Sequence, residues 1–250
     1  MEKRATLVCC YNNLALFLNL EKSINKQNED VDVVAINNCE HKYKSISEAY
    51  NSVINSVSTK YVVFLHQDIL LTDQYIIKQF VDDCEKIGTY DILGVAGKIR
   101  GCPYGLGNIR TGYEMKRAVR GEINGMHECD TVDECFFGGW TECFQKYAFS
   151  EKVCYGWHLY AVDRCLAALT RGNKVYLSDS NLVHLSGGKT DHAYNIMLYK
   201  LCKQYCKSID EVATTCETMP TRPIAREIKF VKLELSVFKR DLLSKFRGKS

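Results

Sequence analysis

The sequence predicts an α/β protein whose central, mostly parallel sheet is flanked by helices in a Rossmann-like arrangement. Over the first hundred residues, short strand-like runs alternate with segments whose apolar residues recur at helical spacing, which is the pattern of βαβ units. The most apolar run, residues 61–65, is rich in β-branched and aromatic residues, as expected of a strand buried on both faces. Three of these runs end in polar residues, and open α/β sheets bind ligands beyond the carboxyl ends of their strands.

The individual elements follow from local patterns. We expect strands at 6–10, 31–36, 61–69 and 92–97, with helices at 14–26, 46–57 and 73–86 between them. Residues 100–124 are rich in glycine and charge without periodicity, which is typical of a loop that faces substrate. Beyond it we expect a strand at 130–138, an amphipathic helix at 160–170 and a strand at 174–177.

Composition excludes several classes of protein. The chain has 250 residues, 46% of them hydrophobic, and its net charge of +3 is too small to indicate a nucleic-acid partner. No apolar run approaches the roughly 18 residues that a membrane span requires, and Met1–Arg4 lead directly into a strand without a secretory signal. We therefore expect a cytoplasmic protein whose thirteen cysteines are mostly reduced thiols of the core.

The polar residues at the strand ends predict a nucleotide site. Asp68 follows the apolar run 61–65, near the end of the expected strand 61–69. A carboxylate there can hold a divalent cation that in turn holds a diphosphate. The turn after the first strand contains no glycine, so the phosphate-binding fingerprint of a dehydrogenase is missing. Side-chain hydrogen bonds could instead read the base and ribose, and the candidates are Tyr11, Asn12, Asn38, His66 and Gln67. Asparagine is also common in turns, so Asn12 and Asn38 remain open between the two interpretations.

Four residues of the second half are candidates for chemistry. Asp133 lies just ahead of an apolar strand end and could face an acceptor. Asp163 lies in the first turn of the helix at 160–170, where the helix dipole favours the ionised form that a general base needs; it could equally only satisfy that turn. His158 could be a base, a ligand or a packed ring. His184 precedes a glycine pair and could complete a metal shell begun by Asp68.

Taken in order, these motifs resemble those of family-2 glycosyltransferases of the GT-A type, and in particular a bacterial subgroup with a His-Gln-Asp strand end and a Trp-His-Leu-Tyr segment. The resemblance covers about residues 5–205. It rests on Ala49-Tyr50-Asn51, Phe64 to Asp68, Gly94 to Gly97, Phe149-Ser150-Glu151, Trp157 to Asp163, and His184-Leu185-Ser186.

The resemblance implies a GT-A fold, a nucleotide-diphosphate-sugar donor, a divalent metal (Mn²⁺ or Mg²⁺) and transfer with inversion at the anomeric carbon. A UDP-sugar is the expected donor, and the acceptor is expected to be a polysaccharide, a glycolipid or a protein glycan. Asp68 and His184 match the metal-binding positions, Tyr50 and Asn51 are implied to contact the donor, and Trp157 the acceptor. Many members of the family that it resembles carry an acidic residue where this chain has Ala161, which makes Asp163 the nearest carboxylate for the catalytic base.

The chain divides by character near residue 220. Residues 1–100 are expected to bind the donor, residues 101–220 to supply the acceptor and catalytic half, and residues 221–250 to form a basic amphipathic helix. That last segment carries nine Lys and Arg against three acids, a net charge of +6, and its apolar stripe runs Ile224, Ile228, Val231, Leu235, Phe238, Leu242 and Phe246. It could lie on an anionic membrane surface where a lipid-linked acceptor would be found, form a homodimer, or pack on its own domain.

Two other functions compete with a sugar transferase. A nucleotidyltransferase also places a metal-binding carboxylate at a strand end, but it needs a glycine- and basic-rich loop where this chain has Tyr11-Asn12-Asn13. A non-catalytic module that binds nucleotide sugars is compatible with Ala161, and turnover of donor in the presence of acceptor separates it from an enzyme.

Overall fold

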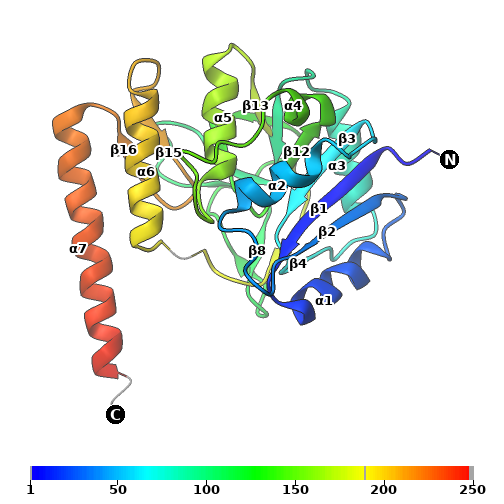
Figure 1. The fold of residues 1–250 in the computed structure, drawn as a ribbon, viewed down its shortest axis with the longest axis horizontal. Helices are drawn as coiled ribbons and strands as arrows, with labels where there is room; N and C mark the ends of the chain where they lie inside the picture. Colours follow the sequence, from blue (N-terminus) through cyan, green and yellow to red (C-terminus); the bar gives the residue numbers. More distant parts are fainter. Residues whose placement is uncertain (1, 189, 248–250) are drawn as a thin grey trace.

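The computed structural model describes residues 2–188 and 190–247, and it shows a seven-stranded sheet covered by helices on both faces (Figure 1). Five of the seven strands run in one direction, because only β12 and β10 pair antiparallel with their neighbours. The predicted α/β fold with a mostly parallel sheet is confirmed. In spatial order the strands are β10 (His127–Cys129), β13 (Val175–Leu177), β5 (Ile92–Gly94), β12 (Phe136–Trp140), β3 (Tyr61–Leu65), β1 (Ala5–Tyr11) and β2 (Asp32–Asn37).

The central strand β3 explains the layered core. All five of its residues are buried, and alternate side chains enter the two hydrophobic clusters on opposite faces of the sheet. Helices α1 (Leu14–Ile24) and α3 (Ile76–Cys84) cover one face, while α2 (Ile46–Ile54), α4 (Thr141–Lys146) and α5 (Tyr160–Thr170) cover the other. The side chain of Asn13 caps α1 shortly after the end of β1, and that of Ser45 caps α2 at the end of the loop that follows β2.

Three predicted strands are each divided in the structure, and the first is the run 61–69, which forms β3 and then β4 (Ile69–Leu70). The run 92–97 forms β5 and then β6 (Ala96–Lys98), and the run 130–138 forms β11 (Thr131–Val132) and then β12. β6 and β11 pair with each other in a separate small sheet with β7 (Leu106–Gly107). The close approach depends on Gly97, where an added Cβ would lie 2.2 Å from the carbonyl oxygen of Thr131.

A second small sheet lies beyond the carboxyl end of β3. It consists of β4 (Ile69–Leu70), β14 (Val183–His184), β8 (Arg110–Thr111) and β9 (Lys116–Arg117), so the expected loop 100–124 contains short strands. β14 pairs antiparallel with β4 and sets His184 opposite Ile69. This pairing delivers His184 to the strand end that carries Asp68.

The last part of the chain packs at one edge of the domain. It contains α6 (His192–Tyr205), the hairpin of β15 (Glu211–Ala213) and β16 (Thr218–Pro220), and the long helix α7 (Pro223–Arg247). α7 lies alongside α6 and extends past it (Figure 1). The predicted tail helix is present; its residues 248–250 lie outside the described residues, and so does the side chain of Phe246.

Two further features bear on the sequence predictions. Within the described residues, every helix is too short or too polar to cross a bilayer. All thirteen cysteines lie in the described part of the chain and are free thiols, and eight of them are buried, as expected of core thiols.

Candidate active site

Three side chains converge beyond the end of the central strand. His66 and Asp68 lie in the turn between β3 and β4, and His184 lies in β14. One ligand atom from each of His66, Asp68 and His184 lies within 4.8 Å of those of the other two. The Nε2 atom of His184 is 3.2 Å from Oδ1 of Asp68 and 3.3 Å from Nδ1 of His66. The backbone N–H groups of Leu185 and Ser186 donate to the carbonyl and the carboxylate of Asp68, which fixes the two segments together.

The protonation preferences of this cluster suit metal binding. Burial, followed by the charge of His184, lowers the pKa of His66 to about 4, so its ring is neutral at physiological pH. Burial alone would raise the pKa of Asp68, but hydrogen bonds from His184 and Ser186 outweigh it and hold this pKa well below the usual range. Burial opposes protonation of His184 as well, and Asp68 outweighs it, so the pKa of His184 is raised. Binding of a cation would take the place of that proton.

The donor set fits a divalent transition metal. Two imidazole nitrogens and one carboxylate oxygen suit an ion such as Mn²⁺ better than Mg²⁺, which prefers oxygen ligands almost entirely. The second ring nitrogen of His66, Nε2, lies 2.9 Å from the hydroxyl of Tyr160, an interaction that orients the ring. The residues present therefore can hold the divalent metal that the sequence predicts.

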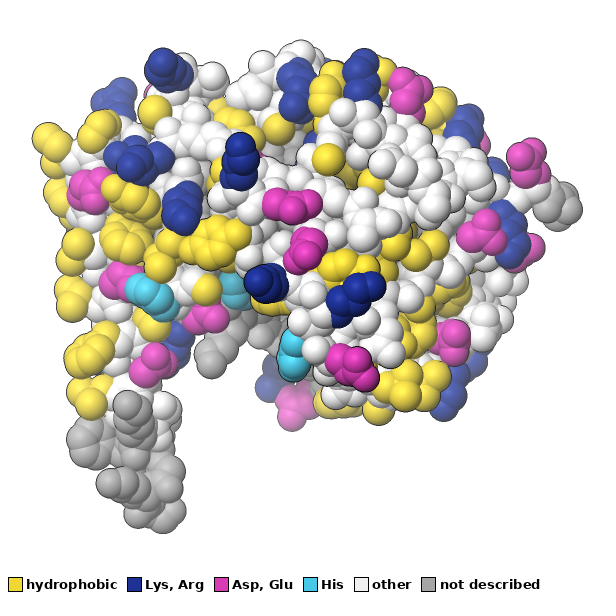
Figure 2. Space-filling model, viewed as in Figure 1, with side chains coloured by type: hydrophobic (Ala, Val, Ile, Leu, Met, Phe, Trp, Pro, Cys, Tyr) yellow, Lys and Arg dark blue, Asp and Glu magenta, His cyan; other side chains and the backbone are white. Residues whose placement is uncertain are grey.

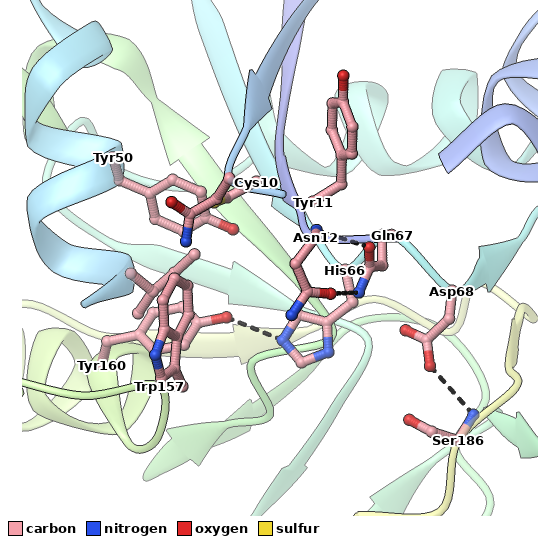
Figure 3. Close-up of a pocket in the computed structure, with 12 residues that line it drawn as sticks. Cys10, Tyr11, Asn12, Tyr50, His66, Gln67, Asp68, Trp157, Tyr160 and Ser186 are labelled. Carbon is pink, nitrogen blue, oxygen red and sulfur yellow. Dashed lines mark hydrogen bonds between the residues drawn. The ribbon is translucent and has the colours of Figure 1, made fainter. Parts of the chain in front are cut away.

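A cavity of about 270 Å³ opens at the tips of β1, β2 and β3 (Figure 3). It contains seven of the eight predicted donor-binding residues, namely Tyr11, Asn12, Asn38, Tyr50, His66, Gln67 and Asp68. Trp157, Tyr160 and Ser186 also line it. We call this space the strand-tip cavity.

Gln67 ties two of these strand tips together. Its Oε1 accepts hydrogen bonds from the backbone N–H groups of Asn12 and Asn13 at 3.0 and 2.8 Å, and its Nε2 donates to the side chain of Asn12 at 2.8 Å (Figure 3). The amide of Asn38 is bonded to the backbone of Tyr43 and so closes its own loop. Both asparagines thus support turns while their residues line the cavity.

A second cavity of about 330 Å³ adjoins the first, and we call it the lateral cavity. The two cavities share His66, Trp157 and Ser186, so they meet beside the cluster that can bind metal. The lateral cavity contains Asp133, Trp157, His158 and His184, which the sequence singles out, together with Glu134, Asp191 and residues 214–216 of the β15–β16 hairpin.

Two neighbouring carboxyl groups in the lateral cavity have opposite protonation preferences. Asp133 accepts hydrogen bonds from the hydroxyl of Thr215 at 2.7 Å and the N–H of Cys135 at 3.1 Å; these and the charge of His184 outweigh burial and lower its pKa. Oε1 of Glu134 is buried without a hydrogen-bond partner among the described residues. Burial, followed by the charge of Asp133, raises the pKa of Glu134 well above its usual value. The two neighbouring carboxyl groups therefore favour opposite protonation states.

His158 is held at the lateral cavity by a strained turn. Leu159, which follows it, is buried and has a φ of 63°, a conformation that a residue with a branched side chain rarely adopts outside constrained sites. Nε2 of His158 is 3.5 Å from Oδ1 of Asp191, and its ring packs edge-on against Tyr194. The histidine thus has a carboxylate partner and access to the cavity.

Two predicted site residues are placed elsewhere. Asn51 exchanges two hydrogen bonds with the backbone of Phe149 and donates a third to Glu151, so it joins α2 to the segment before α5 and lines neither cavity. The carboxylate of Asp163 points into the interior, where the hydroxyl of Tyr205 donates to it at 2.7 Å. α6 covers this face of α5, which is why Asp163 does not reach the cavities.

Sequence reasoning missed several residues of the site. His66 was expected only to contact the donor, and its place in the cluster that can bind metal was missed. Tyr160 lies within the Trp-His-Leu-Tyr segment, and Glu134 adjoins Asp133, so local signals for both existed. Thr215 and Cys216 come from a distant hairpin with no chemical motif of its own, so only the tertiary structure reveals them.

The fold is a mixed α/β fold of the GT-A type, with a mostly parallel central sheet and flanking helices. The chain belongs to the glycosyltransferase-like family whose profile matches residues 6–208. No protein with a curated description matches the chain.

Solved structures share the fold at low sequence identity. A mannosyltransferase from Pyrobaculum calidifontis, solved with GDP-Man and Mn²⁺, matches with a TM-score of 0.56 and 12% identity over 84% of this chain and 65% of its own. GalNAc-T7, solved with UDP, GalNAc and Mn²⁺, matches with a TM-score of 0.56 and 8% identity over 80% and 47%. TarS from S. aureus matches with a TM-score of 0.51 and 12% identity over 83% and 40%. The chain spans less than two thirds of each of these chains.

Proposed function

We propose that this protein is a metal-dependent inverting glycosyltransferase that moves a sugar from a nucleoside-diphosphate sugar, expected to be a UDP-sugar, to a hydroxyl of a glycan or lipid-linked acceptor. The observation that carries the proposal is the position of His66, Asp68 and His184 where two cavities meet. One cavity then holds the nucleotide and the other the acceptor, with the reacting atoms between them. Structures of similar fold solved with GDP-Man and Mn²⁺, and with UDP, GalNAc and Mn²⁺, support a nucleotide-sugar donor and a divalent metal.

The chain's own residues have distinct tasks in this proposal. Asn12, Gln67 and the turn after β1 would hold the nucleoside, and Trp157, which is 43% exposed and lines both cavities, would offer a flat apolar face to the sugar. Asp68, His66 and His184 would hold the divalent cation, which when bound neutralises charge on the departing nucleoside diphosphate.

We propose His158 as the general base. It would take the proton of the acceptor hydroxyl as that oxygen bonds to the anomeric carbon and the bond to the diphosphate breaks, and Asp191 would stabilise the charged ring. The other acids are less suited: Glu134 favours its protonated form, both oxygens of Asp133 accept hydrogen bonds, and Asp163 faces Tyr205. Acceptor hydroxyls could bind to Glu134 and Asp133.

A second candidate function is a module that binds nucleotide sugars without turnover. Ala161 favours it, because this residue is fully buried in α5 at the position where the family resemblance leads us to expect an acid. Release of nucleoside diphosphate in the presence of acceptor would exclude it. A cytoplasmic location and the bacterial subgroup remain predictions.

The direct test is calorimetric binding of UDP, GDP, CMP and dTDP with and without Mn²⁺, for the wild type, Asp68→Ala and Asp210→Ala. Asp210 is exposed and lines neither cavity, which makes its substitution a matched loss of one carboxylate. We expect metal-dependent binding of one nucleoside diphosphate that Asp68→Ala loses and Asp210→Ala retains. Binding of none of the four by the folded wild type would refute the proposed function.

A further inference from the structure

The outer side of α7 carries a regular apolar stripe that no described residue covers. Its six residues are 44–78% exposed, and they are Ile224, Ile228, Val231, Leu235, Phe238 and Leu242. Figure 2 shows the hydrophobic side chains along the edge of the molecule formed by α7. The opposite side of the helix is already used, since Leu233 and Val237 are buried and Phe230 packs against Tyr199 of α6. A helix with apolar residues on two sides needs a second partner.

The spacing of the stripe is that of a coiled-coil seam. Successive residues are separated by four, three, four, three and four positions, which is a heptad pattern over about 27 Å of helix. In heptad notation, Ile228, Leu235 and Leu242 occupy a, and Ile224, Val231 and Phe238 occupy d. The packed side of α7 falls at positions c and f, which hold Phe230, Leu233 and Val237.

The flanking charges identify the partner. All three g positions are acidic (Glu227, Glu234 and Asp241), while the e positions are Ala225, Lys232 and Lys239. In a parallel pair of identical helices, each g residue faces the e residue of the next heptad on the other helix. Glu227 would then face the partner's Lys232, and Glu234 the partner's Lys239. An antiparallel pair would instead set lysine against lysine and acid against acid.

The same charges disfavour an anionic membrane. Helices that lie on anionic lipid carry basic residues on their polar face, whereas one whole flank of this stripe is acidic. The acids nevertheless remain able to accept further hydrogen bonds. Glu227 uses one oxygen for the hydroxyl of Tyr199, and Glu234 contacts His192 and Asn195 from α6, while each carboxylate oxygen has two lone pairs.

We infer that α7 forms a parallel, in-register, two-stranded coiled coil with a second copy of this chain, and this inference does not depend on the proposed function. Leucine at a with β-branched residues at d would by itself favour three or four strands. The free surface of α7 favours two strands, because positions c and f are packed against the domain and α6 also contacts Glu227 and Glu234 at g. The two globular domains would lie on opposite sides of the pair.

Sedimentation of the full chain over a concentration series tests the pairing. We expect a species of twice the monomer mass. Leu235→Asp, which changes an exposed stripe residue, should give monomers, and Lys232→Glu with Lys239→Glu should weaken association by at least about tenfold. Leu243→Asp is the matched control, because Leu243 is 52% exposed on the same helix but lies off the stripe. A monomeric wild type, or equal loss in the control, would overturn the inference.

Crosslinking tests the direction. Ile224→Cys should form a disulfide-linked dimer on mild oxidation, because parallel chains bring the two copies of position 224 together, whereas antiparallel chains separate them by the length of the stripe. Leu243→Cys and the wild type report background from exposed native cysteines. No crosslink above that background contradicts a parallel pair. Monomeric protein that sediments with phosphatidylserine vesicles, and loses this with Leu235→Asp, would assign the stripe to a membrane instead.

Discussion

Nε2 of His184 lies 3.2 Å from Oδ1 of Asp68, although the two residues come from opposite halves of the chain. The contact follows from the backbone, since β14 pairs with β4 directly after the turn that carries Asp68. Because strand pairing holds the site in place before any ligand binds, less conformational entropy is lost on binding.

The metal preference is the first prediction. Because two of the three ligands are imidazoles, Mn²⁺ should promote nucleotide binding at lower concentrations than Mg²⁺. Titration of each ion against a fixed nucleotide concentration measures this. His184→Ala should reduce the apparent Mn²⁺ affinity by at least about tenfold. A stronger response to Mg²⁺ would mean that the ligands are mainly oxygen atoms and that the cluster is not the site.

Tyr160 should orient His66 for metal binding. Its hydroxyl is 2.9 Å from Nε2 of the ring, and loss of such a contact typically lowers metal affinity by about 10–100-fold. We therefore expect this reduction for Tyr160→Phe in a Mn²⁺ titration followed by electron paramagnetic resonance. Tyr61→Phe is the control, because the buried hydroxyl of Tyr61 has no described hydrogen-bond partner and its loss should leave the metal affinity unchanged. Equal affinities for the two variants would refute the orienting role.

Gln67 should stabilise the turn after β1. Gln67→Ala removes three hydrogen bonds to Asn12 and Asn13, so the free energy of unfolding should fall by about 1–2 kcal/mol and nucleotide binding should weaken. Gln67→Glu keeps the acceptor for both backbone N–H groups and should be closer to the wild type in urea denaturation. If the two variants were equally destabilised, the backbone contacts would not be the source of the effect.

If His158 is the general base, substitutions of His158 and of Asp163 should have different effects on turnover. His158→Gln should lower kcat by about 10²–10⁴-fold while donor affinity stays unchanged. Asp163→Asn should retain most of the activity, because its carboxylate faces Tyr205 rather than either cavity. Steady-state kinetics with calorimetry of the donor separates the two effects. Loss of turnover confined to Asp163→Asn would restore the base expected from the sequence.

Asp163 should also affect stability in a pH-dependent way. Burial raises its pKa, although the hydroxyl of Tyr205 partly opposes this. The folded state then binds the proton more tightly than the unfolded state, so the destabilisation is absent below pH about 4 and grows as pH rises through the raised pKa. Asp163→Asn removes this pH-dependent destabilisation. Its free energy of unfolding relative to the wild type should therefore increase as the pH rises from about 4 through the raised pKa of Asp163, and a difference independent of pH would contradict the prediction.

The sequence by itself determined most elements of the first hundred residues and most of the residues that line the strand-tip cavity. β3 consists entirely of buried residues that are apolar in the sequence, and the polar residues that follow β1, β2 and β3 meet at one edge because parallel strands end together. The heptad spacing of α7 is also visible in the chain, since a helix turns local spacing directly into a face.

Only the tertiary structure decided what each candidate side chain faces. Periodicity shows that Asp163 lies in the first turn of a helix, but the later helix α6 turns that carboxylate from a candidate base into a buried partner of Tyr205. Asn51 likewise lies on a predicted helix, and only the structure shows that its side chain binds the backbone of Phe149. The lateral cavity depends on a hairpin at 211–220 that packs beside Asp133. Such contacts join segments far apart in the chain, and local patterns of hydrophobicity carry no information about them.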